Sequence, residues 1–267
     1  MGASSPQAKA LVVDSDRAST SLLVSLLRNA WKREIFEATD CASAWEMLET
    51  LVPDLIFVAH APPDMDAPKF TRQLRRGDLA ARKTPVVMLA HEPTRSTTLD
   101  ARDAGVHEVL RKPYTTRDLL CHVEHLVGKD RNWIEGIAYV GPDRRRFNSA
   151  GFSGARKRRL DKEALSPENA RIGQALRIMK AAVDAIETDP RQALRALRAQ
   201  ADELQSASAA MADYALAGAA KTLKEYLDTS PKLNGRRLAA SIDGIIGASG
   251  GNVPPPEPAA EKVLWIK

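Results

Sequence analysis

The chain has 267 residues, of which 44% are hydrophobic and 27% charged, and its formal net charge is +5. This length and apolar content suffice for two small domains with buried cores, which excludes a wholly disordered protein. No run of about 18 apolar residues is present, so we expect no membrane-spanning segment and a cytoplasmic location. Cys41 and Cys121 show neither disulfide nor metal-ligand spacing, and we expect no metal and no cofactor.

Between residues 9 and 128, short runs rich in Val, Ile and Leu alternate with stretches of helical periodicity. This alternation is typical of a parallel sheet covered by helices, and it predicts a doubly wound five-stranded α/β domain behind a flexible N-terminus at 1–8. The predicted strands are Ala10–Val13, Glu34–Ala38, Leu55–Ala59, Val86–Ala90 and Glu108–Leu110. The predicted helices include Leu22–Ala30, a face through Ala44, Leu48 and Leu51, Lys69–Arg75, a helix ending at Gly105, and Thr116–Val127.

The residues just after each strand decide the chemistry of such a sheet, because ligands bind at the carboxyl ends of parallel strands. The sequence there reads DSD at 14–16, PPDMD at 62–66 and RKP at 111–113, and DAG at 103–105 precedes the last strand. Together these motifs resemble the receiver domain of two-component response regulators, the CheY-like family. The resemblance implies a flavodoxin-like fold over residues 9–128.

Receivers of this family bind Mg²⁺ through acidic residues and accept a phosphoryl group from a histidine kinase on an aspartate. A lysine and a hydroxyl then hold the phosphate, and an aromatic residue moves inward. The resemblance places these roles, in chain order, on the acidic pair Asp14 and Ser15, the phosphoacceptor Ala59, the hydroxyl position Ala90, the aromatic position Val109 and the lysine Lys112.

Four of these positions have lost the group that the chemistry needs. An alanine methyl is neither a nucleophile nor a metal ligand, and one carboxylate cannot supply the several oxygens that Mg²⁺ requires. We therefore interpret the domain as a pseudo-receiver without catalytic activity, in which Lys112 pairs with Asp14 as a structural remnant. His60 should face away from the pocket, since neighbouring strand residues face opposite sides, and the nearby acids are expected to be solvated. These acids are Asp54, Asp64 and Asp66.

The positive charge is concentrated in a predicted basic linker at 129–165. Residues 129–162 contain ten basic and four acidic residues, a net +6, so the rest of the chain carries −1. The linker holds two copies of one pattern, YVGPDRRR at 139–146 and FSGARKRR at 152–159. The candidate anion- or nucleotide-binding residues are Tyr139, Arg144, Arg145, Arg146, Phe152, Lys157, Arg158 and Arg159.

An aromatic ring beside a cluster of guanidinium groups can stack on a base and bind phosphates. This chemistry suits a cyclic dinucleotide, and the linker is similar in position and composition to the arginine-rich segments with which some CheY-like proteins bind cyclic di-GMP. It also suits single-stranded nucleic acid. A solvated linker that contacts acidic partners explains the same charges. The sequence leaves these three interpretations open.

Residues 166–248 are rich in alanine and show four amphipathic stretches, which predict an antiparallel helical bundle. One stretch faintly resembles the active helix of histidine phosphotransfer domains, with Asp202 at the histidine position, Gln205 at the lysine and Ser206 at the glycine. A generic bundle gives the same pattern. All five histidines precede residue 126, so the bundle cannot carry a phosphohistidine.

Residues 249–267 form a Pro- and Gly-rich tail with an apolar end at 263–267, which is expected to be disordered or to dock on a protein surface. The sequence as a whole predicts a non-catalytic regulator or adaptor of bacterial two-component phosphorelay signalling, which binds other two-component signalling proteins. Cyclic di-GMP binding is the first alternative and nucleic-acid binding the second. Homodimer formation is left open.

Overall fold

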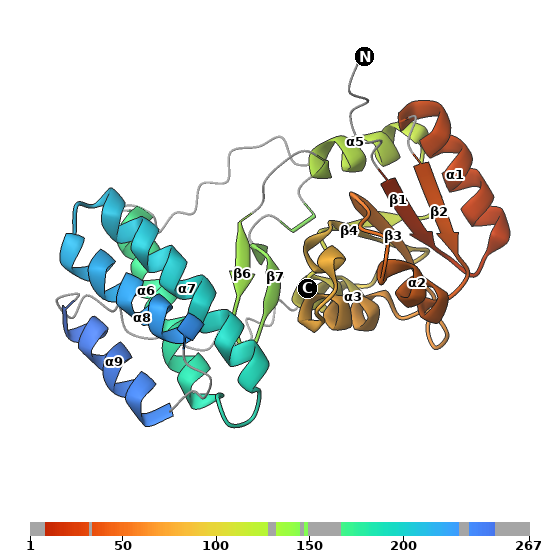
Figure 1. The fold of residues 1–267 in the computed structure, drawn as a ribbon. Coiled ribbons are helices and arrows are strands. Elements are labelled where there is room, and N and C mark those ends of the chain that lie inside the picture. Colours follow the sequence, from red (N-terminus) through yellow and green to blue (C-terminus); the bar gives the residue numbers. More distant parts are fainter. Residues whose placement is uncertain are drawn as a thin grey trace, which may run out of the picture. The chain divides into compact units, whose positions relative to one another are not determined.

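The computed structural model describes residues 9–31, 34–127, 132–144, 147–148, 167–229 and 235–248. The chain divides into two compact units (Figure 1). The first contains the residues up to Ile134 together with Ala138–Ala155, and the second contains Glu135–Ile137 together with the residues from Arg156 onward. The predictions for residues 1–8 and 249–267 lie outside the described residues.

The first unit contains a five-stranded sheet in the order β2-β1-β3-β4-β5, and every pair of neighbouring strands is parallel. The predicted doubly wound α/β class is therefore confirmed. The strands are β1 (Lys9–Val13), β2 (Glu34–Ala38), β3 (Leu55–His60), β4 (Val86–Ala90) and β5 (Glu108–Arg111). The helices are α1 (Arg17–Trp31), α2 (Cys41–Leu48), α3 (Ala67–Arg76), α4 (Arg95–Ala104) and α5 (Thr116–Leu126), with a 3₁₀ turn, η1, at Ala80–Lys83.

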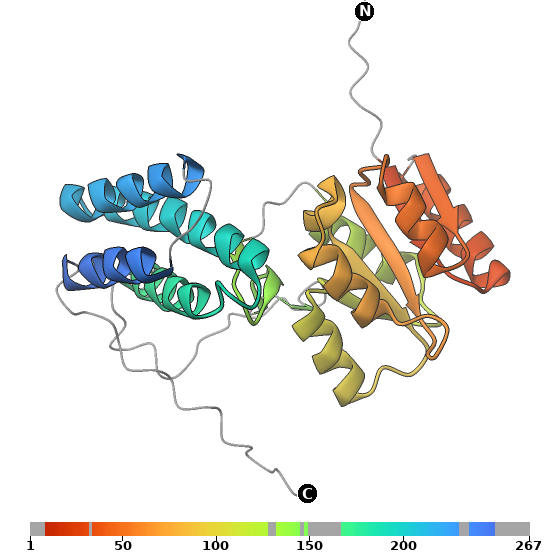
Figure 2. The same cartoon turned by 60° about the horizontal axis from the view of Figure 1, so that its bottom comes forward.

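Helices cover both faces of this sheet (Figure 2). One apolar cluster joins Ile56 and Val58 of β3 to α2, α3 and α4, and the other joins Phe57 of β3 to α1 and α5. Because successive strand residues alternate between two buried faces, the strands read as continuous apolar runs rather than as alternating ones.

Several helix boundaries differ from the prediction, and the largest difference is at α1, which begins at Arg17 rather than at Leu22. The second helix ends at Leu48 instead of continuing to Leu51, which is nevertheless buried just beyond the helix end. The third begins two residues earlier than expected, because the side chain of Asp66 accepts the N–H of Lys69 and a proline occupies the first turn. Asp66 is thus a helix cap.

The segment after α5 contains two short strands, although the sequence predicted a linker there. These are β6 (Trp133–Glu135) and β7 (Val140–Pro142), which pair in a two-stranded sheet. The N–H of Asp143 donates to the carbonyl of Asn132 at 2.9 Å beside this pairing. Strands of three residues are too short to show a period-two pattern, so no sequence signal marks them.

The second unit is a bundle of helices, as predicted. The described helices are α6 (Pro167–Asp184), α7 (Pro190–Ala210), α8 (Tyr214–Thr229) and α9 (Gly235–Ala248). Neighbours in the chain pack together, and α9 also packs against α6 (Figure 2). The core joins leucines to small alanines such as Ala196 and Ala201, which are fully buried. In the part of the chain that the structure describes, we find no helix with both the length and the apolar character to cross a bilayer.

Candidate functional site

The carboxyl ends of the strands bring together the positions that the sequence singled out. In the parallel ladders Val13 of β1 lies beside Val58 of β3, so Asp14 and Ala59 follow next to each other. At the other side of β3, the carbonyl of Ala90 at the end of β4 accepts the N–H of Lys112 at 2.8 Å. Four of the predicted pocket positions therefore lie on one edge of the sheet.

The polar side chains of this edge are joined in a closed ion pair. Lys112 Nζ donates to Asp14 Oδ2 at 2.6 Å, and the two side chains are 8% and 5% exposed. The other carboxylate oxygen of Asp14 accepts the N–H of Asp16 at 3.0 Å. The predicted pairing of Lys112 with Asp14 is therefore present in the structure.

The second acid of the motif, Asp16, accepts hydrogen bonds from the start of α1. Its carboxylate accepts the N–H of Ala18 at 3.0 Å and the hydroxyl of Ser19 at 2.7 Å, at the start of α1. The hydrogen bond from Ser19, followed by that from Ala18, lowers the pKa of Asp16. Ser15 between the two acids is exposed. Asp16 is thus committed to the helix end, and within the described ranges no three His, Cys, Asp or Glu side chains form a group that could hold a metal.

Two other polar residues, one at each end of β3, are not part of the Asp14–Lys112 pair. His60 is half-buried at the strand end, on the face opposite to Ala59 by strand alternation. Asp54 precedes the strand at its amino end and accepts the N–H of Lys9 at 2.7 Å.

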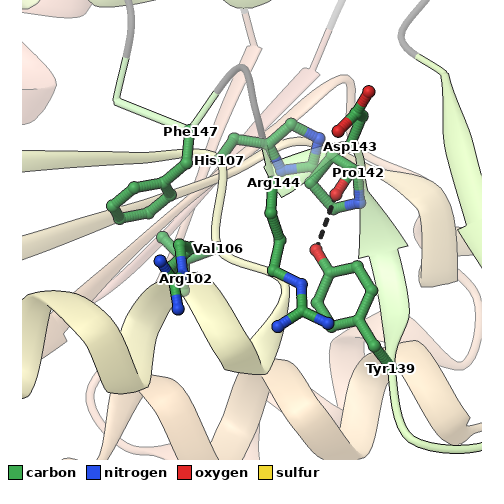
Figure 3. Close-up of a pocket in the computed structure, with 8 residues that line it drawn as sticks. All are labelled: Arg102, Val106, His107, Tyr139, Pro142, Asp143, Arg144 and Phe147. Atoms are coloured by element: carbon green, nitrogen blue, oxygen red, sulfur yellow. Dashed lines mark hydrogen bonds between the residues drawn. The ribbon is translucent and has the colours of Figure 1, made fainter. Parts of the chain in front are cut away.

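In the first copy of the repeated motif, the tyrosine contacts other residues of the same copy. Tyr139 is 5% exposed, and its hydroxyl donates to the carbonyl of Pro142 at 2.6 Å (Figure 3). Burial raises the pKa of Tyr139 to about 12. A Cβ on Gly141 would lie 2.6 Å from the Tyr139 hydroxyl and 2.9 Å from the Cα of Gly105. The motif therefore needs glycine because β7 approaches both its own tyrosine and the turn after α4.

Arg144 of this copy is held by two partners. Its guanidinium carbon lies 4.1 Å from the centroid of the Tyr139 ring, and Nη1 donates to Asp103 Oδ1 at 2.9 Å. The same oxygen accepts from Arg102 Nε at 3.0 Å. Although burial opposes it, the hydrogen bonds and positive charges of the two arginines lower the pKa of Asp103. Arg144 thus takes the place against the Tyr139 ring that the sequence assigned to a base.

A small cavity opens beside this contact (Figure 3). Its free interior is about 10 Å³, which is room for roughly one water molecule and not for a nucleobase. The residues that line it are Arg102, Val106, His107, Tyr139, Pro142, Asp143, Arg144 and Phe147.

The outer edge of β5 is covered by the residues that follow the first copy. The N–H of Asn148 donates to the carbonyl of His107 at 3.0 Å, and Asn148 Oδ1 accepts the N–H of Val109 at 3.1 Å. Phe147 packs against the apolar cluster that contains Val109. Asn148, in a turn with a left-handed backbone (φ 49°), therefore bonds to the edge of the sheet with one main-chain and one side-chain group. No sequence signal marks it, since a single asparagine in a polar segment is ordinary.

Arg75 is a second buried cation that the sequence did not reveal. It is 1% exposed, and its four hydrogen bonds to carbonyls go to Gly105, Arg82 and Thr84 at 2.6 to 3.2 Å. Its guanidinium also lies 5.4 Å from the ring centroid of Trp133. Burial lowers the pKa of Arg75 to about 9, so the group keeps its charge at neutral pH. The segment that begins at Trp133 is thus part of the first unit's packing.

The remaining predicted residues are of two kinds. Arg145, Arg146, Phe152, Lys157, Arg158 and Arg159 lie outside the described residues. In the bundle, Asp202 is exposed on α7 and forms an ion pair with Lys224 of α8. Gln205 and Ser206 follow on the same helix, half-buried and exposed. The position that resembles a phosphohistidine therefore lies at the bundle surface.

The parallel sheet in the order β2-β1-β3-β4-β5, with a lysine and an aspartate at its carboxyl edge, defines a receiver-type domain. Residues 10–124 match the family described as the response regulator receiver domain. These residues are therefore a receiver domain of two-component signalling.

Curated relatives are similar over the same region. Response regulator MprA of Mycobacterium ulcerans (strain Agy99) is 32% identical over 123 residues, which cover 45% of this chain and 50% of that protein. Protein-glutamate methylesterase/protein-glutamine glutaminase 1 of Dechloromonas aromatica (strain RCB) is 33% identical over 128 residues, 46% of this chain and 35% of that protein. The chain thus spans half or less of the length of these relatives.

Solved structures of receivers are similar in fold. Chemotaxis protein CheY4 of Vibrio cholerae is 23% identical with a TM-score of 0.43, and the match covers 45% of this chain and 99% of that one. A two-component response regulator from Clostridium difficile is 23% identical with a TM-score of 0.41, covering 45% and 95%.

Proposed function

We propose that this protein is a non-catalytic regulator or adaptor of two-component phosphorelay signalling, which binds partner proteins through a receiver domain that is not phosphorylated. The observation that carries the proposal is the closed Asp14–Lys112 pair, 2.6 Å long, at a sheet edge where alanines stand at positions 59 and 90. The lysine that would hold a phosphate is neutralised by the carboxylate that would hold Mg²⁺.

Phosphoryl transfer at this edge lacks its chemical parts. Ala59 offers no oxygen for the new P–O bond, and Asp14 is a single carboxylate for a cation that prefers six oxygen ligands. Asp16 could add a carboxylate only by giving up its hydrogen bonds to the start of α1. Recognition between proteins needs none of these groups, and receiver domains interact with other two-component proteins. The methylesterase named above is covered for 35% of its length, so its activity is not transferred to this chain.

A direct test is to incubate the full chain with acetyl phosphate and Mg²⁺ and to record its intact mass, with a receiver that keeps its acceptor aspartate in the same tube. We expect the control receiver to gain a phosphoryl group and this chain to stay unmodified. A stoichiometric adduct on this chain that is stable in acid and labile in base would overturn the proposal.

A test of the partners uses the full chain as bait in its native cell. We expect histidine kinases, response regulators or phosphotransfer proteins to be captured, and to be captured equally by the Ala59→Gly variant, because binding does not depend on a phosphoacceptor. Capture that requires prior phosphorylation of the bait contradicts the proposal.

A second candidate is binding of a cyclic dinucleotide by Arg145, Arg146 and the second copy of the motif. It is supported by the net +6 of residues 129–162. Calorimetry with cyclic di-GMP should show binding that the double variant Arg145→Ala, Arg158→Ala loses. Absence of binding to the parent excludes it. Affinity for single-stranded nucleic acid that falls steeply with salt would favour nucleic acid instead.

A further inference from the structure

The second unit contains three residues that lie about thirty positions before its first helix. They are Glu135, Gly136 and Ile137. Glu135 ends the extended strand β6 and is 4% exposed, and Ile137 is packed against the apolar core of the bundle. The bundle therefore already holds a short peptide segment from outside its helices as one of its packed elements.

Two buried glutamines of α7 hold this segment. Gln192 Nε2 donates to Glu135 Oε1 at 2.9 Å and to the carbonyl of Gly136 at 3.1 Å. Gln200 Nε2 donates to the carbonyl of Glu135 at 3.2 Å. The two glutamines are 3% and 7% exposed, and they lie just over two helical turns apart. We call Gln192 and Gln200 the α7 amide pair.

The contacts of the α7 amide pair are those of peptide recognition. Two of the three hydrogen bonds go to main-chain carbonyls, which every extended peptide presents, and the third goes to a carboxylate. The apolar side chain of Ile137 follows two residues later and supplies hydrophobic burial. Such a combination of main-chain bonds and alternate side chains is how extended segments are read on protein surfaces.

The segment leaves one buried acceptor unused. Among the residues that the structure describes, Gln192 Oε1 has no hydrogen-bond partner, although the atom is buried. Exchanging the amide oxygen and nitrogen would bring the oxygen against the Glu135 carboxylate, so the orientation is fixed by its neighbours. A buried acceptor without a donor is unfavourable, and a ligand that brings an N–H to this point gains over Glu135–Ile137.

We propose that the α7 amide pair is a docking site for an extended segment of a partner protein, which the chain's own Glu135–Ile137 fills until a partner displaces it. The partner segment carries an acidic residue, an aliphatic residue two positions later, and a main-chain N–H that reaches Gln192 Oε1. This site lies in the helical unit and goes beyond the proposed function, since it does not depend on the state of the Asp14–Lys112 pair.

The test uses the full chain with the double substitution Glu135→Ala, Ile137→Ala, and a labelled peptide of sequence WIEGIAY, which repeats residues 133–139. The double substitution removes the carboxylate and the apolar side chain that help to hold the tethered segment, which makes this segment a weaker competitor, and we call this variant the emptied chain. Fluorescence anisotropy should show binding to this variant and binding at least about tenfold weaker to the parent, where the tethered segment competes. Adding Gln192→Leu should weaken binding about tenfold or more, because it removes two donors, one of them to a carboxylate. Gln205→Leu, on the same helix and half-buried, should leave binding unchanged.

A change in the peptide keeps the test independent of how the variants fold. The substitution Glu135→Leu within the labelled peptide removes the carboxylate and should weaken binding to the emptied chain about tenfold. Equal binding of the two peptides, no binding to the emptied chain, or equal loss with Gln205→Leu each overturn the proposal. A parent dimer in sedimentation that Gln192→Leu converts to monomer would assign the site to a second copy of the chain, and would also overturn it. None of these outcomes bears on phosphorylation, so failure here is distinct from failure of the proposed function.

Discussion

Among the described residues of the first unit, two cationic side chains are buried, and they are stabilised in opposite ways. Lys112 lies at the carboxyl ends of the strands and has a carboxylate, Asp14, at 2.6 Å. Arg75 lies near the amino ends of β4 and β5 and donates to the carbonyls of three residues in two turns, with Trp133 over its face. A single residue neutralises the first charge, whereas the second needs the surrounding backbone and a residue beyond the matched receiver region.

The difference shows where this domain has been elaborated. At the carboxyl edge, the pair of Asp14 and Lys112 closes the position where a receiver would carry its chemistry. Beyond the matched region, Trp133 lies over Arg75, Arg144 pairs with Asp103, and Asn148 bonds to the edge of β5. The first copy of the repeated motif is therefore a structural contact in the described residues. The following predictions test this contrast, from the largest expected effect to the smallest.

Replacing Arg75 with methionine should have the largest effect on stability. The substitution introduces an apolar side chain of similar length. It leaves the carbonyls of Gly105, Arg82 and Thr84 without their hydrogen-bond donor. We expect the free energy of unfolding of the first unit to fall by about 4 kcal/mol in urea denaturation. Arg72→Met on the exposed side of the same helix is the control, with an expected change within about 0.5 kcal/mol. Equal effects of the two would contradict the role of Arg75.

Breaking the Asp14–Lys112 pair from one side should be nearly as costly. Asp14→Ala leaves the ammonium of Lys112 buried without a counter-charge, and we expect a loss of about 3 kcal/mol in the same measurement. Adding Lys112→Met should restore most of this loss, because two apolar side chains bury well where one unpaired charge does not. If the double variant is as unstable as Asp14→Ala, the loss of stability does not come from an unpaired buried charge, and the prediction is contradicted.

Gly141→Ala should introduce a steric clash where β7 packs against the turn after α4. The new Cβ would meet the hydroxyl of Tyr139 at 2.6 Å and the Cα of Gly105 at 2.9 Å, and we expect a loss of about 2 kcal/mol. The matched control is Gly218→Ala in α8, where nothing lies within 4 Å of the added atom and alanine should stabilise its helix by roughly 0.5 to 1 kcal/mol. Thermal unfolding of both variants measures the two signs, and two losses would contradict the expected clash at Gly141.

Tyr139→Phe should have the smallest effect. The ring under Arg144 remains, and the lost hydrogen bond to Pro142 is worth about 1 kcal/mol. The pKa of Tyr139 is higher in the folded state, about 12 against an ordinary value of 10.0, so its contribution to stability is complete below pH 10 and is lost as the pH rises to 12. Parent and variant titrated by phenolate absorbance should differ only near pH 12. A difference that appears already at pH 10 would place Tyr139 in solvent.

The sequence predicted the receiver fold well because its strands are buried on both faces. Apolar runs such as Leu55–Ala59 give nearly the observed strand bounds, and Gly105 marks a helix end that the structure confirms. The short strands β6 and β7 were missed, since their stability comes from packing rather than from a repeating pattern. The Asp14–Lys112 pair was also predicted, because the carboxyl ends of all parallel strands meet at one edge of the sheet, although β1 and β5 themselves are not adjacent.

The sequence by itself determined the α/β sheet followed by a helical bundle, the residue types at the strand ends, and the net +6 of residues 129–162. These are properties of single positions and of local periodicity. Only the tertiary structure decided that the Arg144 guanidinium stacks on the Tyr139 ring and that Arg75 is buried among carbonyls. The same holds for the hydrogen bond from Gln192 of α7 to Glu135. Each of these facts depends on a contact between residues that are distant in the chain, or on burial. The spacing of residue types along the sequence predicts neither of these two properties.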